Sequence, residues 1–83
     1  MYSYKEQRSF VFTEEGQIIF LKIRDKIHNT LETAGAIRMD CAIAGNTGQV
    51  WDMMACVDRL VELNEIVEVT NENVPGQFRI FTK

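Results

Sequence analysis

Cysteine, histidine, proline and tryptophan are scarce in this chain of 83 residues, which has two cysteines and one of each of the others. Two thiols cannot form the disulfide framework of a small secreted domain, and no cysteine or histidine pair has the spacing of a zinc site. We therefore expect no bound metal. Cys41 and Cys56 are expected to be small buried side chains in a reducing cytoplasm. His28 lies among polar residues and is expected to be exposed to solvent.

Positive charge and long apolar runs are also in short supply. Nine Lys and Arg oppose twelve Asp and Glu, which gives a net charge of −3. This balance excludes a nucleic-acid binder that is basic throughout. No apolar run approaches the roughly 20 residues of a membrane-spanning helix, and no signal-peptide pattern opens the chain. The sequence therefore predicts a cytoplasmic protein without a membrane partner.

Motifs of catalysis are missing from the sequence. It contains no glycine-rich phosphate loop, no nucleophile elbow and no pair of carboxylates at catalytic spacing. We therefore expect a protein that is not an enzyme, with no cofactor and no small-molecule substrate. What the chain does have is ordinary globular composition, 46% hydrophobic and 25% charged, which is sufficient for one domain with one core.

The longest periodic segment predicts a helix from Thr13 to about Ala34. The Thr13 hydroxyl can accept from the free amides of the first turn, and Glu14 and Glu15 place negative charge at the positive end of the helix dipole. Gly35 suits the left-handed position after the last turn. The apolar stripe expected to face the core comprises Ile19, Phe20, Ile23, Ile27, Leu31 and Ala34.

The segment before this helix has no clear helical period. Its aromatic residues are Tyr2, Tyr4, Phe10 and Phe12. Residues 10–12 favour a short strand or an extended arm, and the aromatic side chains could instead close the core from outside. We therefore divide the chain into an N-terminal arm or short strand, residues 1–12, and a domain of residues 13–83.

Two further helices are expected after a short apolar step at residues 36–37. A short helix covers 38–44, a turn covers 45–48, and a second helix runs from about 48 to 63. Asn46 or Thr47 is expected to cap the second helix, and Asn64 suits a left-handed position after it. The apolar stripe of the second helix consists of Val50, Met53, Met54, Val57, Leu60 and Val61.

The end of the chain favours strands. Residues 66–70 and 77–81 alternate or are β-branched, and 71–76 have the composition of a turn, so a β-hairpin is predicted. The core is expected to join this hairpin to the two long helices. Its predicted members are Phe20, Ile23, Ile27, Leu31, Met53, Val57, Leu60, Ile66, Phe78 and Ile80.

In its order of elements, the chain resembles the winged helix-turn-helix superfamily. The stretch DRLVELNEIVEV, residues 58–69, is similar to the junction between the family's recognition helix and its first wing strand. Residues 78–82, FRIFT, are similar to the returning wing strand. The resemblance covers residues 13–82 and implies an α+β fold with three helices, namely a long first helix and a helix-turn-helix pair, followed by a two-stranded hairpin wing.

The outward face of the second helix of the motif indicates protein contacts. In DNA-binding members of the superfamily this helix enters the major groove, but here its outward face is mainly acidic and carries an indole. Tryptophan is enriched at interface hot spots, and acidic neighbours favour a basic partner. A protein partner or a homodimer is therefore the first hypothesis. The candidate partner-contact residues are Trp51, Asp52, Ala55, Asp58 and Glu62.

DNA binding by a small transcriptional regulator stays open as the alternative. The fold favours it, as do polar groups near the start of the same helix, but few cations are available to contact phosphates. Any DNA affinity is therefore expected to be weak and sensitive to salt. The candidate DNA contacts are Arg38, Asn46, Thr47, Gln49, Lys22 and Lys26.

Overall fold

The computed structural model describes residues 1–70 and 76–83 and has an α+β architecture. The described residues form four α-helices, one 3₁₀ helix and a three-stranded antiparallel sheet. The elements in chain order are α1 (Tyr4–Val11), α2 (Glu14–Ala34), β1 (Ala36–Arg38), α3 (Met39–Ile43), α4 (Val50–Glu62), β2 (Val67–Glu68), η1 (Gly76–Phe78) and β3 (Ile80–Thr82).

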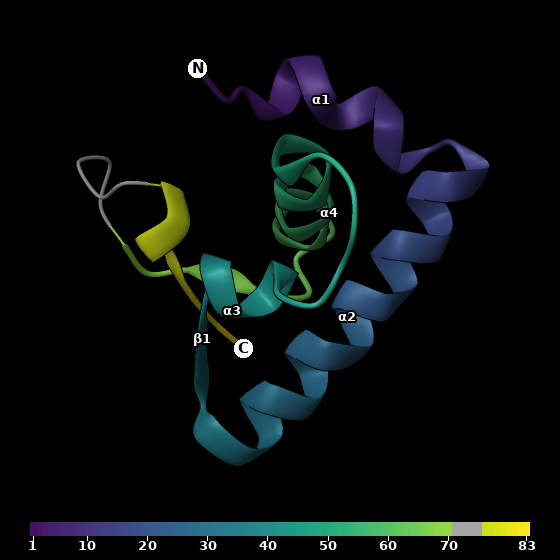
Figure 1. Ribbon diagram of the computed structural model, residues 1–83. Coiled ribbons are helices and arrows are strands. Elements are labelled where there is room, and N and C mark those ends of the chain that lie inside the picture. The colour runs from purple at the N-terminus through teal and green to yellow at the C-terminus, as the bar shows by residue number, and fades with distance from the viewer. Residues whose placement is uncertain (71–75) are drawn as a thin grey trace.

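The helix α4 occupies the middle of the molecule. In Figure 1, α1 lies above α4, α2 runs along its side, and α3 lies below it. Each of α1, α2 and α3 contacts α4 directly. Six consecutive residues of α4, from Met53 to Asp58, are buried. A helix that is buried all round lies inside a core, whereas a helix with one buried stripe lies at its surface.

The sheet has three strands in the order β1-β3-β2, and both pairings are antiparallel. The sequence predicted only the β2–β3 hairpin and treated residues 36–37 as an apolar step. That prediction is incomplete, because Ile37 is buried and lies opposite Phe81, which is also buried. This cross-strand pair adds β1 to the edge of β3. The predicted turn at 71–76 falls outside the described residues except for Gly76, which begins η1.

Both predicted ends of α2 are confirmed. The Thr13 hydroxyl accepts from the Gly16 amide at 3.0 Å, and Gly35 closes the helix with a φ of 79°. Four of the six predicted stripe residues are buried, namely Phe20, Ile23, Ile27 and Leu31. Ile19 is half-buried, and Ala34 is exposed because it lies in the last turn, beyond the packed part of the helix.

Eight of the ten predicted core residues are buried, and the two exceptions come from the last strand. Phe78 is 48% exposed, Ile80 is half-buried, and the buried aromatic residue is Phe81. The prediction assumed regular alternation over residues 77–81. Gly76–Phe78 instead forms a 3₁₀ turn, so side chains alternate between the two faces only from β3 onward. In this register Phe81 points toward the core.

Residues 4–11 form a helix, so the expectation of a short strand at 10–12 is wrong. The corner between α1 and α2 is tightly built around Gly16. A Cβ atom at this position would lie 1.9 Å from the Phe10 carbonyl oxygen, closer than any real contact. The Thr13 hydroxyl donates to the same oxygen at 2.7 Å, and the Gln17 amide donates to the Val11 carbonyl. Val11 is fully buried and anchors this end of α1.

The start of α4 also differs from the prediction. The cap position is Gln49, and its side chain makes no capping hydrogen bond, so neither Asn46 nor Thr47 caps the helix. Asn46 instead donates from its side chain to the Ile43 carbonyl at 3.1 Å. Asn64 has the predicted left-handed conformation, with a φ of 61°.

Replacing Leu60 by alanine is expected to lower the free energy of unfolding by about 2–5 kcal/mol, because its fully buried side chain would leave a cavity. Total stability for a chain of this length is roughly 4–12 kcal/mol, so the variant should be partly unfolded or much less stable. Denaturant unfolding measures the change. Leu63→Ala, at a position 42% exposed in the same helical region, is the control and should cost less than about 1 kcal/mol. Equal losses in the two variants would contradict the assignment of Leu60 to the core.

Candidate functional site

The outward face of α4, which the sequence marks as the partner-contact surface, is largely covered by α1. The two helices lie next to each other in Figure 1 and are in direct contact. Ala55 is fully buried, and Asp58 is only 9% exposed. The expectation that these two residues are open to a partner is therefore wrong for this structure. The polar face of α4 meets the N-terminal segment of its own chain.

Each of the three predicted acidic residues on this face accepts a hydrogen bond from residues 2–8. Asp52 accepts from the Gln7 side-chain amide at 3.0 Å. Asp58 accepts from the Tyr2 hydroxyl at 2.6 Å. The third, Glu62, is the most heavily contacted. These contacts satisfy carboxylates that the sequence suggested for an external basic partner.

Glu62 accepts from three donors. The Tyr4 hydroxyl donates at 2.6 Å, Arg59 at 2.8 Å, and Arg8 donates to both carboxylate oxygens at 3.0 Å. These contacts, led by that of Tyr4, lower the pKa of Glu62 to about 2. Burial and the hydrogen bond to Glu62 together raise the pKa of Tyr4 to about 12. Arg8 and Arg59 also lie over the ring of Phe12, with guanidinium carbons 4.9 and 5.0 Å from its centroid.

Trp51 remains partly accessible, as the sequence predicted. Trp51 is 41% exposed, and the adjacent Val50 is 46% exposed. The Tyr2 ring approaches the indole edge to face, with centroids 6.3 Å apart and planes at 68°. The first turn of α4 therefore presents an apolar spot that α1 borders but does not cover.

Asp58 also contacts the far end of the chain. Its Oδ1 atom accepts from Arg79 at 2.6 Å, and Arg79 donates to Glu68 of β2 at 2.7 and 2.9 Å. Only 11% of the Asp58 side chain and 17% of the Arg79 side chain are exposed. The hydrogen bonds that Arg79 donates to Glu68 and to Asp58 raise the pKa of Arg79, and the first of these bonds lowers the pKa of Glu68. Arg79 thus joins α4 to the sheet.

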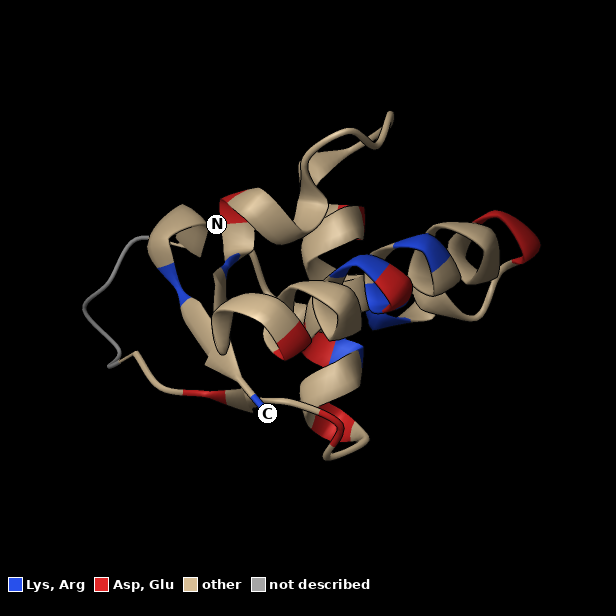
Figure 2. Cartoon of the chain, turned by 90° about the horizontal axis from the view of Figure 1, so that it is seen from below, with Lys and Arg blue, Asp and Glu red and all other residues tan. Residues whose placement is uncertain are grey.

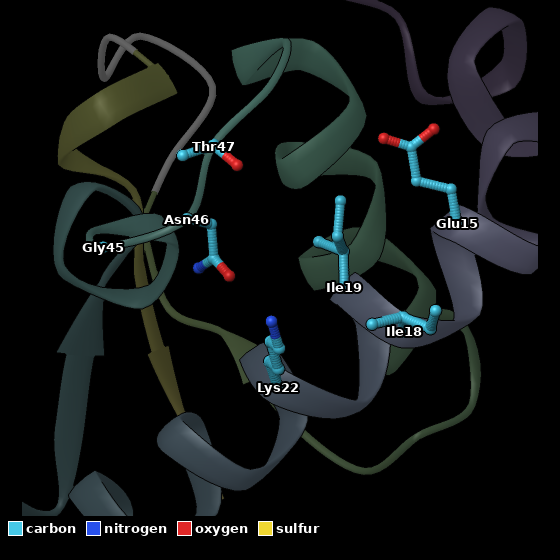
Figure 3. A pocket seen from close by; sticks show the side chains of 7 residues that line it. All are labelled: Glu15, Ile18, Ile19, Lys22, Gly45, Asn46 and Thr47. Atoms are coloured by element: carbon cyan, nitrogen blue, oxygen red, sulfur yellow. The ribbon is translucent and has the colours of Figure 1, made fainter.

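Three of the six candidate DNA-contact residues line one groove. Lys22, Asn46 and Thr47 border a groove of about 420 Å³ between the first half of α2 and the loop before α4. Figure 3 shows the Lys22 amine and the Asn46 side chain pointing toward each other across it. The remaining lining residues are Glu15, Ile18, Ile19 and Gly45. The groove is therefore mixed in charge, with one cation and one carboxylate.

Lys26 and Arg38, two further candidate DNA contacts, do not line this groove, and both side chains contact other parts of the chain. Lys26 donates to the Ala44 carbonyl at 3.0 Å, so its amine is fixed beside the groove. Arg38 pairs with Asp40 at 2.9 Å and lies over the Phe78 ring, at 5.5 Å. In the cartoon of Figure 2, Lys and Arg segments lie among Asp and Glu segments along the part of the chain that is described.

The cysteines and the histidine differ in part from expectation. Cys56 is buried, and burial raises the pKa of its thiol to about 12. Cys41 is exposed, so its predicted burial is wrong; α3 has only five residues and turns this side chain outward. His28 is half-buried and contacts the Glu65 carboxylate at 2.9 Å, rather than lying free in solvent. Within the described residues, no group of three His, Cys, Asp or Glu side chains is arranged to hold a metal ion.

The contact between α1 and α4 was missed at the sequence level, although a signal was present. Tyr4, Arg8 and Val11 are spaced by four and three residues, which places them on one face of a helix. The Tyr4 hydroxyl and the Arg8 guanidinium can donate to the carboxylates of α4, and Val11 can pack against its apolar residues. A helix whose inner face is mostly polar gives no apolar stripe, so hydrophobic periodicity alone does not reveal it.

Among the described residues, no helix combines the length and apolar character needed to cross a membrane. Searches of protein-family models, curated proteins and solved structures find no match to this chain.

Acid is expected to weaken the attachment of α1 through Glu62. The pKa of this carboxyl is lowered from its ordinary 4.5 to about 2, so its contribution to stability is present above pH 4.5 and is lost as the pH falls toward 2. Melting temperatures should be measured from pH 7 to pH 2, and we expect them to decrease as the pH is lowered from 4.5 toward 2. In Glu62→Gln the melting temperature should be lower at pH 7 and should decline less steeply with acid. A parallel decline in both proteins would contradict this role for Glu62.

Proposed function

We propose that this chain is a non-enzymatic winged-helix module that acts through protein contacts, as a dimer or as a regulatory adaptor. The order of α2, a short segment, α3, a turn, α4 and the paired strands β2 and β3 supports the fold assignment. It is the order on which the sequence resemblance rests. The function is argued from the surface of α4, since a fold of this kind serves many roles.

The observation that carries the proposal is the cover on α4. A helix that reads the major groove must present its outer face to the base edges, with cations nearby for the phosphates. Here that face is occupied by α1, and its carboxylates accept hydrogen bonds from Tyr2, Gln7 and Arg8. Entry into a major groove would break these contacts and bring three carboxylates toward the phosphate backbone. Binding of a protein at the exposed first turn of α4 requires neither the loss of these hydrogen bonds nor the approach of carboxylates to phosphates.

The first turn of α4 is the part of this surface best suited to a protein partner. Trp51 and Val50 are both more than two-fifths exposed, and Asp52 next to them is held by Gln7. An aromatic side chain in a rim of polar groups is the usual anchor of an interface. The Tyr2 ring against the indole edge reduces the number of conformations that Trp51 can adopt before binding.

Replacing Trp51 by alanine is expected to weaken self-association, or the binding of a partner, and to leave the fold largely intact. Sedimentation equilibrium over a range of concentrations measures self-association, and a thermal melt reports on folding. Leu63→Ala is the matched control, because Leu63 has nearly the same exposure, 42% against 41%, at the opposite end of α4.

Two results would argue against this role of Trp51. The variant could lose as much stability as Leu60→Ala, which would make the indole a core residue. Alternatively, Trp51→Ala and Leu63→Ala could lower the association constant equally, which would remove the preference for the first turn of α4.

DNA binding is the alternative that one specific observation favours. Lys22, Asn46 and Thr47 converge on one groove beside the start of α4, and the Lys26 amine lies on the neighbouring Ala44 carbonyl. Such a cluster could contact a phosphate without requiring α1 to leave. The Glu15 carboxylate lines the same groove and would repel a phosphate.

Under this alternative, affinity for duplex DNA is expected to be modest and to fall steeply with salt, because each neutralised phosphate adds about −0.9 to the slope of log affinity against log salt. Fluorescence titrations at several salt concentrations measure the slope. Lys22→Ala should reduce the slope by about one, whereas Lys83→Ala, at an exposed position outside the groove, should not. Tight binding that survives physiological salt would overturn our preference for protein contacts.

A further inference from the structure

A single carboxylate links the start of the chain to the sheet. The Oδ2 atom of Asp58 accepts from the Tyr2 hydroxyl at 2.6 Å, and its Oδ1 atom accepts from Arg79 at 2.6 Å. Arg79 also holds Glu68 of β2, and its carbonyl accepts from the Met39 amide at 2.7 Å. Tyr2, Asp58, Arg79 and Glu68 therefore form one continuous series of contacts, which we call the Asp58 relay.

The strength of this relay depends on the exclusion of water. An ion pair stabilises a structure more when it is shielded, and exposed pairs contribute little. The side chains of Asp58 and Arg79 are 11% and 17% exposed with Tyr2 in place. Tyr2 is half-buried, its ring packs against the core and its hydroxyl donates to Asp58, so the side chain lies against the protein rather than in solvent. Removal of Tyr2 would let water reach the pair.

Residues 2–8, which we call the strap, are held by polar contacts and by the rings of Tyr2 and Tyr4, which are partly buried against the core. Within α1 only Val11 is fully buried, and it lies beyond the strap, at the corner fixed by Gly16. The strap itself is fastened by hydrogen bonds from Tyr2, Tyr4, Gln7 and Arg8 to side chains of α4. A helix of eight residues is not stable alone in water. The strap can therefore lift and unwind while the corner at Val11 stays anchored.

We propose that the strap is a displaceable cover on α4 and that the Asp58 relay transmits its displacement to the β2–β3 pair. Opening of the strap removes Tyr2 from Asp58, admits water to the Arg79 pair and loosens the attachment of β2. Coupling of this kind is reciprocal, so a ligand that holds β2 and β3 in place also favours the closed strap. The relay consists of contacts within the chain, and it therefore extends beyond the proposed contact function.

Tyr2→Phe and Tyr4→Phe provide a matched pair of variants for the test. Each removes one hydroxyl that donates to a carboxylate of α4 at 2.6 Å, but Tyr2 contacts Asp58 and Tyr4 contacts Glu62, which lies outside the relay. Both keep the aromatic ring, and a thermal melt verifies that the variants fold. Amide hydrogen exchange by NMR then reports on the Val69 amide, which donates to the Ile80 carbonyl at 2.9 Å.

We expect Tyr2→Phe to accelerate exchange of the Val69 amide about fivefold, at the lower end of measured couplings between sites. Tyr4→Phe should leave this rate nearly unchanged. The proposal is overturned if Tyr2→Phe has no effect at Val69, or if the two variants accelerate exchange equally.

The reverse experiment starts from the sheet. Glu68→Gln weakens the hold on Arg79, and it should accelerate exchange of the Gln7 amide, which donates to the Ser3 carbonyl at 3.1 Å in the strap. Glu65→Gln is the control, since Glu65 pairs with Arg24 and His28 and is not part of the relay. Equal effects of these two variants on Gln7, or no effect of Glu68→Gln, would contradict reciprocal coupling.

Discussion

The burial of α4 on all sides is the constraint on which the rest of the structure depends. Its residues 53–58 form an unbroken buried run, so the helix must be covered in every direction. The stripe of α2 covers one side, and α3 covers another. The remaining side carries Asp52 and Asp58, and an apolar neighbour there would leave carboxylates without hydrogen bonds, at a considerable cost in free energy. The polar inner face of α1 meets that requirement.

Asp58 shows how this constraint extends through the molecule. A buried carboxylate needs donors on more than one side. Tyr2 and Arg79 supply them from opposite ends of the sequence, and Arg79 in turn requires Glu68. One acidic residue in a central helix thereby fixes the position of the N-terminal segment and of the sheet edge. Contacts of this type define an arrangement more than they add stability, because each partner is expensive to bury.

The sequence predicted well those elements whose burial follows a simple period. The helix α2 has one apolar stripe and standard residues at both ends, so its limits and most of its buried residues were found. In α4 four of the six predicted stripe residues are buried, whereas Val50 is exposed and Val61 is half-buried. On the opposite side, Ala55 and Asp58 are buried although the sequence predicts that they are open. Periodicity reveals which residues prefer the interior. It does not reveal that a polar face will be covered by another polar element.

The remaining errors have local physical causes. The sequence predicts an arm or strand in place of α1 because hydroxyl, amide and guanidinium donors interrupt its few apolar residues, of which only Val11 is fully buried. The buried aromatic of the last strand was misplaced by three residues, from Phe78 to Phe81, because a 3₁₀ turn interrupts the alternation. The strand β1 was missed because three residues are too few to establish a period.

The contrast between the two cysteines has a practical consequence. Thiol reagents react with the thiolate, and burial suppresses that form at Cys56, whereas Cys41 on α3 is open to solvent. The folded chain thus carries one site for selective labelling and one that becomes reactive only when the middle of α4 is exposed. The alkylation rate of Cys56 therefore measures how often opening events expose the central helix, without an introduced cysteine or label.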